Sequence, residues 1–284
     1  MYEEPYRWVE AVGNRRQYLD EQFKQGSPVV ALSYADGVLL LTLSKGTPKL
    51  YEIYDRIGLG GMGHPADLEK LRFGLLEMAH LEGFNRSPSD VTGARLMKYG
   101  LAPSIKQAFE EIYKAPSIVK ILLAELGTKA GKDAFLTINY DGTFEEMTGC
   151  AVLAATAAIQ KMMLAELKHA DGPGAVTLAR ALESALHAWG LGSLAQSRAA
   201  GDDRQDDRQD RDQAAASADA RADAKAEVRP EPAAVTTHLR EQMADRTVEC
   251  SVLERHLPGS SKYRAIKPDE LAALLPSGLA PSTA

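Results

Sequence analysis

A strand pair that is apolar on both faces is the feature that most limits how this chain can fold. Residues 28–34 read PVVALSY and residues 38–44 read VLLLTLS, with Asp36-Gly37 at the junction. Asp-Gly is a typical two-residue turn of a β-hairpin. A hairpin with one face in water alternates apolar and polar residues, whereas strands covered on both faces are apolar throughout. We therefore predict that this hairpin lies between two layers of the fold.

The order of the other predicted elements indicates the fold class. Hydrophobic periodicity predicts strands at about 48–57, 117–126, 134–146, 248–256 and 262–267. It predicts helices at about 8–24, 65–83, 87–113 (interrupted at Pro103), 152–168 and 174–190, and a short one from Pro268. Strands joined by tight turns are antiparallel, and consecutive helix pairs form separate covering layers. The chain is thus predicted to be an α+β protein, a four-layer αββα sandwich of two antiparallel sheets.

A glycine-rich run, GLGGMG at 58–63, has the G-x-G-x-x-G pattern of a dinucleotide-binding loop. It follows a predicted strand and precedes a predicted helix, as such a loop does. A dinucleotide-binding unit then needs a second parallel strand, but here another helix is expected from Ser87-Pro88. We therefore predict that these glycines allow close packing and that the run binds no cofactor.

Composition and cysteine usage exclude several classes of protein. The net charge of −6 lacks the basic balance of a nucleic-acid-binding protein. Cys150, Cys250 and the scattered histidines have no metal-ligand spacing, so neither a metal nor a cofactor is expected. The first residues lack the apolar core of a signal peptide, and no apolar run reaches the roughly 18 residues of a membrane span. We expect a cytoplasmic protein without nucleic-acid or membrane partners.

An acidic, repetitive stretch separates the last strands from the rest of the chain. Residues 201–232 contain ten acidic and six basic residues, and Val228 is their only large apolar side chain. Such a composition cannot bury a core, so a disordered insert is predicted at about 199–245. The main domain is expected to span 8–276, with a separate N-terminal segment at 1–7 and a flexible tail at 277–284.

Several stretches together resemble a known family. GSPVVALSYADGVLL, the segment KLYEIYDRIGLGGMG with its following helix, and SDVTGARL are similar to α subunits of bacterial-type proteasome core particles. The closing VECSVLERH and KYRAIKPDELAALL are similar to the last strand pair and helix of those subunits. The resemblance covers about 8–195 and 246–276, and YDRIG and DVTG are its most specific parts. The family has the Ntn-hydrolase sandwich fold, which agrees with the layers predicted above.

The resemblance implies a non-catalytic role in a degradation machine. Subunits of this kind form seven-membered rings that cap rings of proteasome β subunits, and a homo-heptamer is expected here. They gate the entry of tagged protein substrates and receive the C-terminal tails of a hexameric ATPase. In this chain the resemblance places the activator-docking pocket at Lys49 and Gly26, and the gate at Tyr2, Glu3, Glu4, Pro5 and Tyr6.

The same resemblance sets an enzymatic alternative beside the scaffold role. The catalytic β subunits use an N-terminal nucleophile whose free amine serves as the base, and that position falls at Ser27. The Ser27 amine is held in a peptide bond with Gly26, and Leu40–Leu43 supplies no acid, although Lys49 matches the lysine of the catalytic subunits. We therefore expect no enzymatic activity. The alternative is a self-processing hydrolase that cleaves before Ser27.

Overall fold

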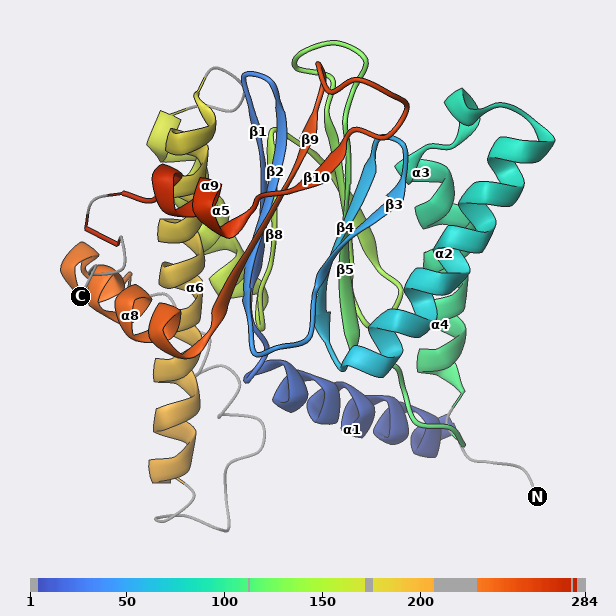
Figure 1. Cartoon of the computed structure of the whole chain (residues 1–284). Coiled ribbons are helices and arrows are strands. Elements are labelled where there is room, and N and C mark those ends of the chain that lie inside the picture. The colour runs from blue at the N-terminus through green and yellow to red at the C-terminus, as the bar shows by residue number, and fades with distance from the viewer. Residues whose placement is uncertain (1–4, 112, 172–175, 207–228, 277, 280–284) are drawn as a thin grey trace.

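Two five-stranded antiparallel sheets lie face to face between two layers of helices, and helix α1 (Pro5–Phe23) crosses one end (Figure 1). The computed structural model describes residues 5–111, 113–171, 176–206, 229–276 and 278–279, with backbone only for 5–7, 169–171 and 201–206. The predicted fold class, a four-layer αββα sandwich of two antiparallel sheets, is confirmed. The sequence predicts that the first helix begins near residue 8, but helix α1 begins at Pro5.

The first sheet contains the hairpin from which the fold was predicted. Its strands run in the order β10 (Tyr263–Ala265), β9 (Thr247–Glu254), β2 (Gly37–Ser44), β1 (Val29–Tyr34) and β8 (Cys150–Leu153). Every residue of β1 and β2 is buried. Val30 and Leu41 pack toward the helices, whereas Val29 and Leu40 pack in the cluster between the sheets. The predicted position of this hairpin between two layers is therefore confirmed.

The second sheet is antiparallel, and each of its strands pairs with the next strand along the chain. Its strands are β3 (Leu50–Tyr54), β4 (Ile57–Gly63), β5 (Val119–Glu125), β6 (Ala134–Ile138) and β7 (Phe144–Thr148), paired in chain order. A turn at Asp141-Gly142 joins β6 and β7, and Gly142 has the positive φ, 85°, that such a turn requires. The connections β3–β4, β5–β6 and β6–β7 are short, whereas the chain between β4 and β5 forms the helices from α2 to α4.

Helices cover the outer faces of both sheets (Figure 1). The second sheet is covered by α2 (Pro65–Asn85), η1 (Pro88–Asp90), α3 (Gly93–Arg95), the π-helical η2 (Leu96–Leu101) and α4 (Ala102–Glu110). The first sheet is covered by α5 (Ala157–Asp171), α6 (Leu178–Asp206), α8 (Pro232–Asp245) and α9 (Pro268–Leu274). The single helix predicted at 87–113 is thus four short elements. Pro103 lies in the first turn of α4, because it cannot continue the hydrogen-bond ladder of a preceding helix.

The glycine-rich run at 58–63 lies in strand β4 and does not form a turn. Where the sequence predicts a single strand at 48–57, the chain therefore forms two strands, β3 and then β4. A Cβ atom on Gly61 would lie 2.3 Å from a methyl carbon of Leu68 in α2. Gly63 has a φ of 133°, and a Cβ there would lie 2.0 Å from the Ile118 carbonyl oxygen. The packing role predicted for these glycines is confirmed, because a side chain at either position collides with its neighbours.

Residues 232–245 form helix α8, which corrects the predicted extent of the disordered insert. Val235 and Leu239 are each 1% exposed and pack on α6, where a Cβ atom on Gly190 would lie 2.6 Å from Leu239 Cγ. Together with Met243 they form an i, i+4, i+8 stripe, which is typical of an amphipathic helix. The acidic composition upstream obscured this stripe in the sequence. The rest of the predicted insert from 207 to 228, and most of the predicted tail, lie outside the described residues.

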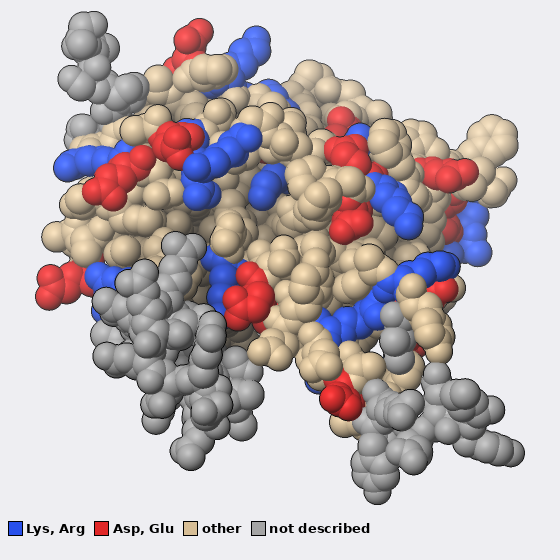
Figure 2. Space-filling view, turned by 90° about the horizontal axis from the view of Figure 1, so that it is seen from below, with Lys and Arg blue, Asp and Glu red and all other residues tan. Residues whose placement is uncertain are grey.

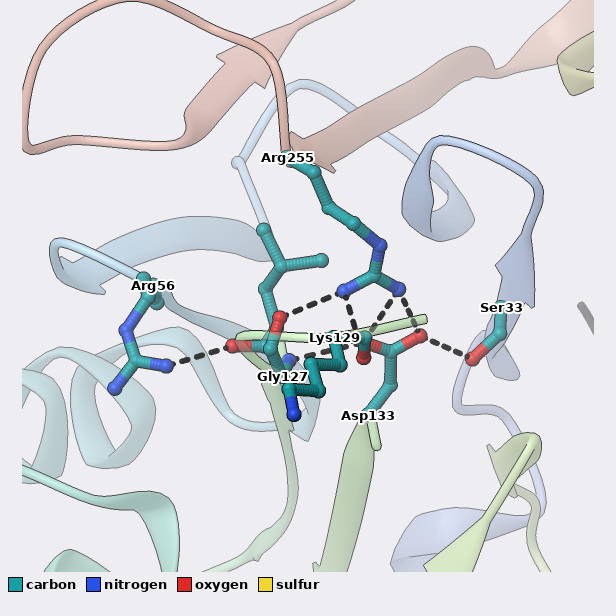
Figure 3. A network of polar contacts seen from close by, with 7 residues as sticks. Ser33, Arg56, Gly127, Lys129, Asp133 and Arg255 are labelled. Atoms are coloured by element: carbon teal, nitrogen blue, oxygen red, sulfur yellow. Dashed lines mark hydrogen bonds and ion pairs between the residues drawn. The ribbon is translucent and has the colours of Figure 1, made fainter. Parts of the chain in front are cut away.

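A buried ion pair joins three loops at the end of the sandwich away from α1 (Figure 3). Arg255, just after β9, donates from Nη2 to both oxygens of Asp133 at 2.8 and 2.7 Å, and from Nη1 to the Gly127 carbonyl at 2.7 Å. Asp133 also accepts hydrogen bonds from Ser33 Oγ and the Gly127 amide, each 2.9 Å long. The carboxylate is therefore saturated, and it ties the end of β1 to the β5–β6 loop and to Arg255.

Candidate functional site

A pocket of about 640 Å³ opens at the end of the sandwich where α1 meets the first sheet. Its walls come from the segment after α1 (residues 24–27), the end of β2 with the β2–β3 loop (43–49), α6 (193–200) and Arg246 before β9. Figure 2 views the molecule from this end, where basic and acidic side chains are interspersed around the centre of the face. Gly26 and Lys49, the two residues predicted for a docking pocket, both line it.

The backbone of Lys49 is held in place from two sides. The Lys49 amide donates to Glu249 Oε2 of β9 at 2.9 Å, and its carbonyl accepts from the Gly61 amide of β4 at 2.9 Å. The side chain is half-buried, and burial lowers the pKa of Lys49, an effect that Glu249 opposes and Arg246 reinforces. Among the described residues, no carboxylate lies within ion-pair distance of the Lys49 ammonium. The site therefore presents an unpaired cation on a rigid strand end.

Gly26 is required by packing and not by an unusual backbone conformation. A Cβ atom at this position would lie 2.4 Å from Met62 Cε. Its amide donates to the Phe23 carbonyl at 2.9 Å, and its carbonyl accepts from Gln196 Nε2 of α6 at 2.8 Å. Gly26 does not adopt a positive φ. Its small size leaves room for the buried side chain of Met62.

Arg246 is the pocket residue that the sequence did not single out. Its Nε atom is buried without a hydrogen-bond partner, and burial lowers the pKa of its guanidinium. It lies between helix α8 and strand β9 in an extended conformation, with φ −134° and ψ 154°. Because it follows the predicted insert at 199–245 and lies about 200 residues from Lys49, no local pattern could have indicated that the two cations share a pocket.

Ser27, the position of the catalytic nucleophile in the enzymatic alternative, is engaged by neutral groups. The side chain is 4% exposed, and its hydroxyl accepts from Trp189 Nε1 at 3.2 Å and lies 3.3 Å from Thr42 Oγ1. In the described part of the chain, no carboxylate, imidazole or amine forms a hydrogen bond with Ser27 Oγ. A hydroxyl without a base remains protonated and is a weak nucleophile, so this arrangement favours the scaffold role.

We therefore expect the chain to remain uncut at the Gly26–Ser27 bond. Intact-mass spectrometry of the protein, purified after co-expression with its β partner, should give the full-length mass, and Ser27→Ala should give the same pattern. A species that lacks residues 1–26 in the wild type but not in Ser27→Ala would contradict this prediction.

The residues predicted to form the gate are only partly described by the structure. Tyr2, Glu3 and Glu4 lie outside the described residues, and Pro5 and Tyr6 belong to the first turn of α1, where only the backbone is described. Within the described ranges, no group of three or more histidine, cysteine or acidic side chains is arranged to hold a metal ion. No described helix has the length and apolar character needed to cross a bilayer.

Comparison with known proteins gives the family. A family model described as proteasome subunit matches residues 23–188, more than half of the chain. Proteasome subunit alpha of Streptosporangium roseum is 33% identical over 177 residues, covering 62% of this chain and 66% of the relative. That of Actinosynnema mirum is 33% identical over 182 residues (63% and 67%), and that of Kineococcus radiotolerans 31% over 193 (66% and 77%).

The matched region spans about two thirds of the length of the first of these relatives. The two stacked antiparallel sheets and the family match together define a chain that belongs to the proteasome subunit family. Within the family its similarity is to the bacterial α type. The resemblance drawn from the sequence is thereby confirmed.

Proposed function

We propose that this chain is a non-catalytic ring subunit that admits substrates to a proteasome core particle and docks its ATPase. Seven copies form a ring that caps a ring of β subunits in the cytoplasm. Tagged proteins pass through the centre, and the residues Tyr2, Glu3, Glu4, Pro5 and Tyr6 gate their entry. Support for the ring comes from the family and its α-type relatives. Support for the non-catalytic role comes from the neutral surroundings of Ser27.

The observation that carries the docking proposal is the half-buried ammonium of Lys49, which pairs with no carboxylate among the residues that the structure describes. A cation partly removed from water without a counter-ion is unfavourable, because burial penalises its charged form. The C-terminal carboxylate of an ATPase tail relieves that cost through a charge-assisted hydrogen bond. Gly26 lines the same pocket, whose volume of about 640 Å³ can hold the last residues of the tail. One such bond can be modest, since several tails acting on one ring raise their effective concentration.

Lys49→Ala is expected to weaken binding of the ATPase or of its tail peptide by at least about 30-fold. Loss of one partner of a desolvated charge pair costs about 2–5 kcal/mol. Affinity is measured by surface plasmon resonance on assembled α/β particles, and unassisted peptide hydrolysis by the same particles should stay unchanged.

Lys161→Ala is the matched control, because this exposed lysine of α5 lies outside the pocket. It should bind as the wild type does. Lys49→Arg keeps the charge but changes the shape of the head group, so an intermediate affinity is expected. Wild-type affinity in Lys49→Ala particles would refute the docking assignment.

A further inference from the structure

Four cationic side chains line the pocket, and they fall into two pairs. Lys24 bonds Glu21 at 2.6 Å, and Lys45 bonds Asp245 at 2.6 Å on the rim. Neither Lys49 nor Arg246 has a carboxylate within ion-pair distance among the described residues. The pocket thus contains two charges that the described chain neutralises and two that it does not.

Arg246 differs from the other described arginines that have a buried, unpartnered Nε. Arg15 donates through Nη2 to backbone carbonyls, Arg95 pairs with Glu82, and Arg255 pairs with Asp133. Arg246 makes no such bond in the described part of the chain. A guanidinium offers five donors in a planar fork that suits a carboxylate. One that is half-buried with no acceptor is therefore a vacant anion-binding group.

The backbones that carry these two cations are well separated along the pocket wall. The Lys49 backbone is hydrogen-bonded to Glu249, and Arg246 precedes Glu249 by three residues of extended chain. At about 3.3 Å per residue, the backbones at the two positions are on the order of 10 Å apart. Residues two to four apart in an extended peptide span about 7–13 Å. An extended peptide with negative charges two to four residues apart therefore spans about the distance between the two backbones.

We propose that Arg246 is a second anion-binding residue of this pocket and that the pocket selects a peptide C-terminus with an acidic side chain two to four residues before its end. The proposal rests on the docking function of Lys49, which takes the terminal carboxylate. Arg246 takes the side-chain carboxylate through a bidentate contact. The pocket volume of about 640 Å³ falls within the usual range for sites that enclose a small ligand.

The test uses nine-residue peptides of Gly, Ser and Ala that end in Leu and carry an N-terminal fluorophore. A single Glu occupies the third, fourth or fifth position from the C-terminus, which is two to four residues before the last residue, and each peptide has a Gln counterpart. Every peptide is made with a free carboxylate and with a C-terminal amide. Binding to assembled α/β particles is measured by fluorescence polarisation for the wild type, Arg246→Gln, Arg246→Lys and the control Lys161→Gln.

For at least one position of Glu, the wild type and Lys161→Gln should bind the Glu peptide about tenfold more tightly than its Gln counterpart. Arg246→Gln should bind the two within twofold, and Arg246→Lys should keep an intermediate preference. Electron microscopy checks that each variant assembles into rings. If Arg246→Gln does not assemble, the Glu preference of Arg246→Lys is compared with that of the wild type instead. A Glu preference that is absent from the wild type, or that survives unchanged in the Arg246 variants, overturns the proposal.

The free-carboxylate and amide arms separate this inference from the docking function. If the amide weakens binding but Glu and Gln peptides bind alike, Lys49 docking stands and the role of Arg246 falls. If the amide binds as well as the free carboxylate, the docking function itself is wrong.

Discussion

Asp133→Ala is expected to lower the free energy of unfolding by about 3–5 kcal/mol, because it leaves the charge of Arg255 without its partner inside the protein. The side chains of Asp133 and Arg255 are only 2% and 12% exposed. The substitution also removes the acceptor of Ser33 Oγ and of the Gly127 amide, so two further donors lose their bonds (Figure 3). Urea unfolding of the purified chain, followed by circular dichroism, measures the change.

Asp245→Ala is the matched control for this effect. Asp245 also pairs with a cation, Lys45, but the two side chains are 70% and 62% exposed, and solvent screens such a pair so that it adds little to stability. In the double variant Asp133→Ala/Arg255→Ala, the loss should be smaller than the sum of the two single losses, since the pair is lost only once. Equal effects of Asp133→Ala and Asp245→Ala would contradict the structural role assigned to the buried pair.

The second large effect is a dependence of stability on pH that arises from Lys120. This lysine of β5 is 9% exposed, and burial lowers its pKa to about 8, although Asp20 and Asp141 oppose the shift. Its ammonium donates to the carbonyls of Ala154 and Ala155 at 3.0 and 2.9 Å. Between pH 8 and the unfolded-state pKa near 10.4, the unfolded chain holds a proton that the native chain has released. Stability contributed by this group therefore rises with pH across that interval, by up to about 3 kcal/mol.

Comparison with Lys120→Met isolates this contribution. Methionine has a similar length and no titratable group, so the wild type should gain about 1.4 kcal/mol per pH unit relative to the variant above pH 8. Urea unfolding at pH 7.0, 8.0, 9.0 and 9.5 measures the difference, which should be flat below pH 8. For the exposed Lys161→Met, the difference from the wild type should stay constant throughout. A constant difference for Lys120→Met would refute the depressed pKa.

The sheets and most helices could be predicted because their signals are local. Period-two and uninterrupted apolar runs, with Asp-Gly turns between them, identify β1, β2, β6 and β7 from a few neighbouring residues. The glycine-rich run misled the prediction because a strand that packs closely on both faces also needs glycines, as the Cβ contact of Gly61 with Leu68 shows. Local pattern alone cannot separate a glycine that bends the chain from one that lets a neighbour approach.

The candidate site could be predicted only in part. Lys49 and Gly26 came from a family resemblance, and the structure brings them to one pocket. No sequence pattern indicated Arg246 or Lys120, because the importance of each residue lies in its surroundings. Among the described residues, Arg246 has no counter-ion. Lys120 lies under α1, with its ammonium 4.7 Å from the centre of the Phe23 ring. The surroundings of both residues are formed by segments distant in sequence. Hydrophobic periodicity in a single sequence does not indicate which distant segments come together.

The pairing of β2 with β9 has a consequence for synthesis of the chain. The two strands pair along eight residues, from Gly37 with Glu254 to Ser44 with Thr247, so about 200 residues of synthesis separate them. At about 5–20 residues per second, the outer edge of β2 stays without its partner for roughly 10–40 s on the ribosome. An unpaired and largely apolar edge strand can pair with other chains. Any product truncated between residues 45 and 246 keeps that edge open permanently, so the last strands of this protein also protect its first hairpin from aggregation.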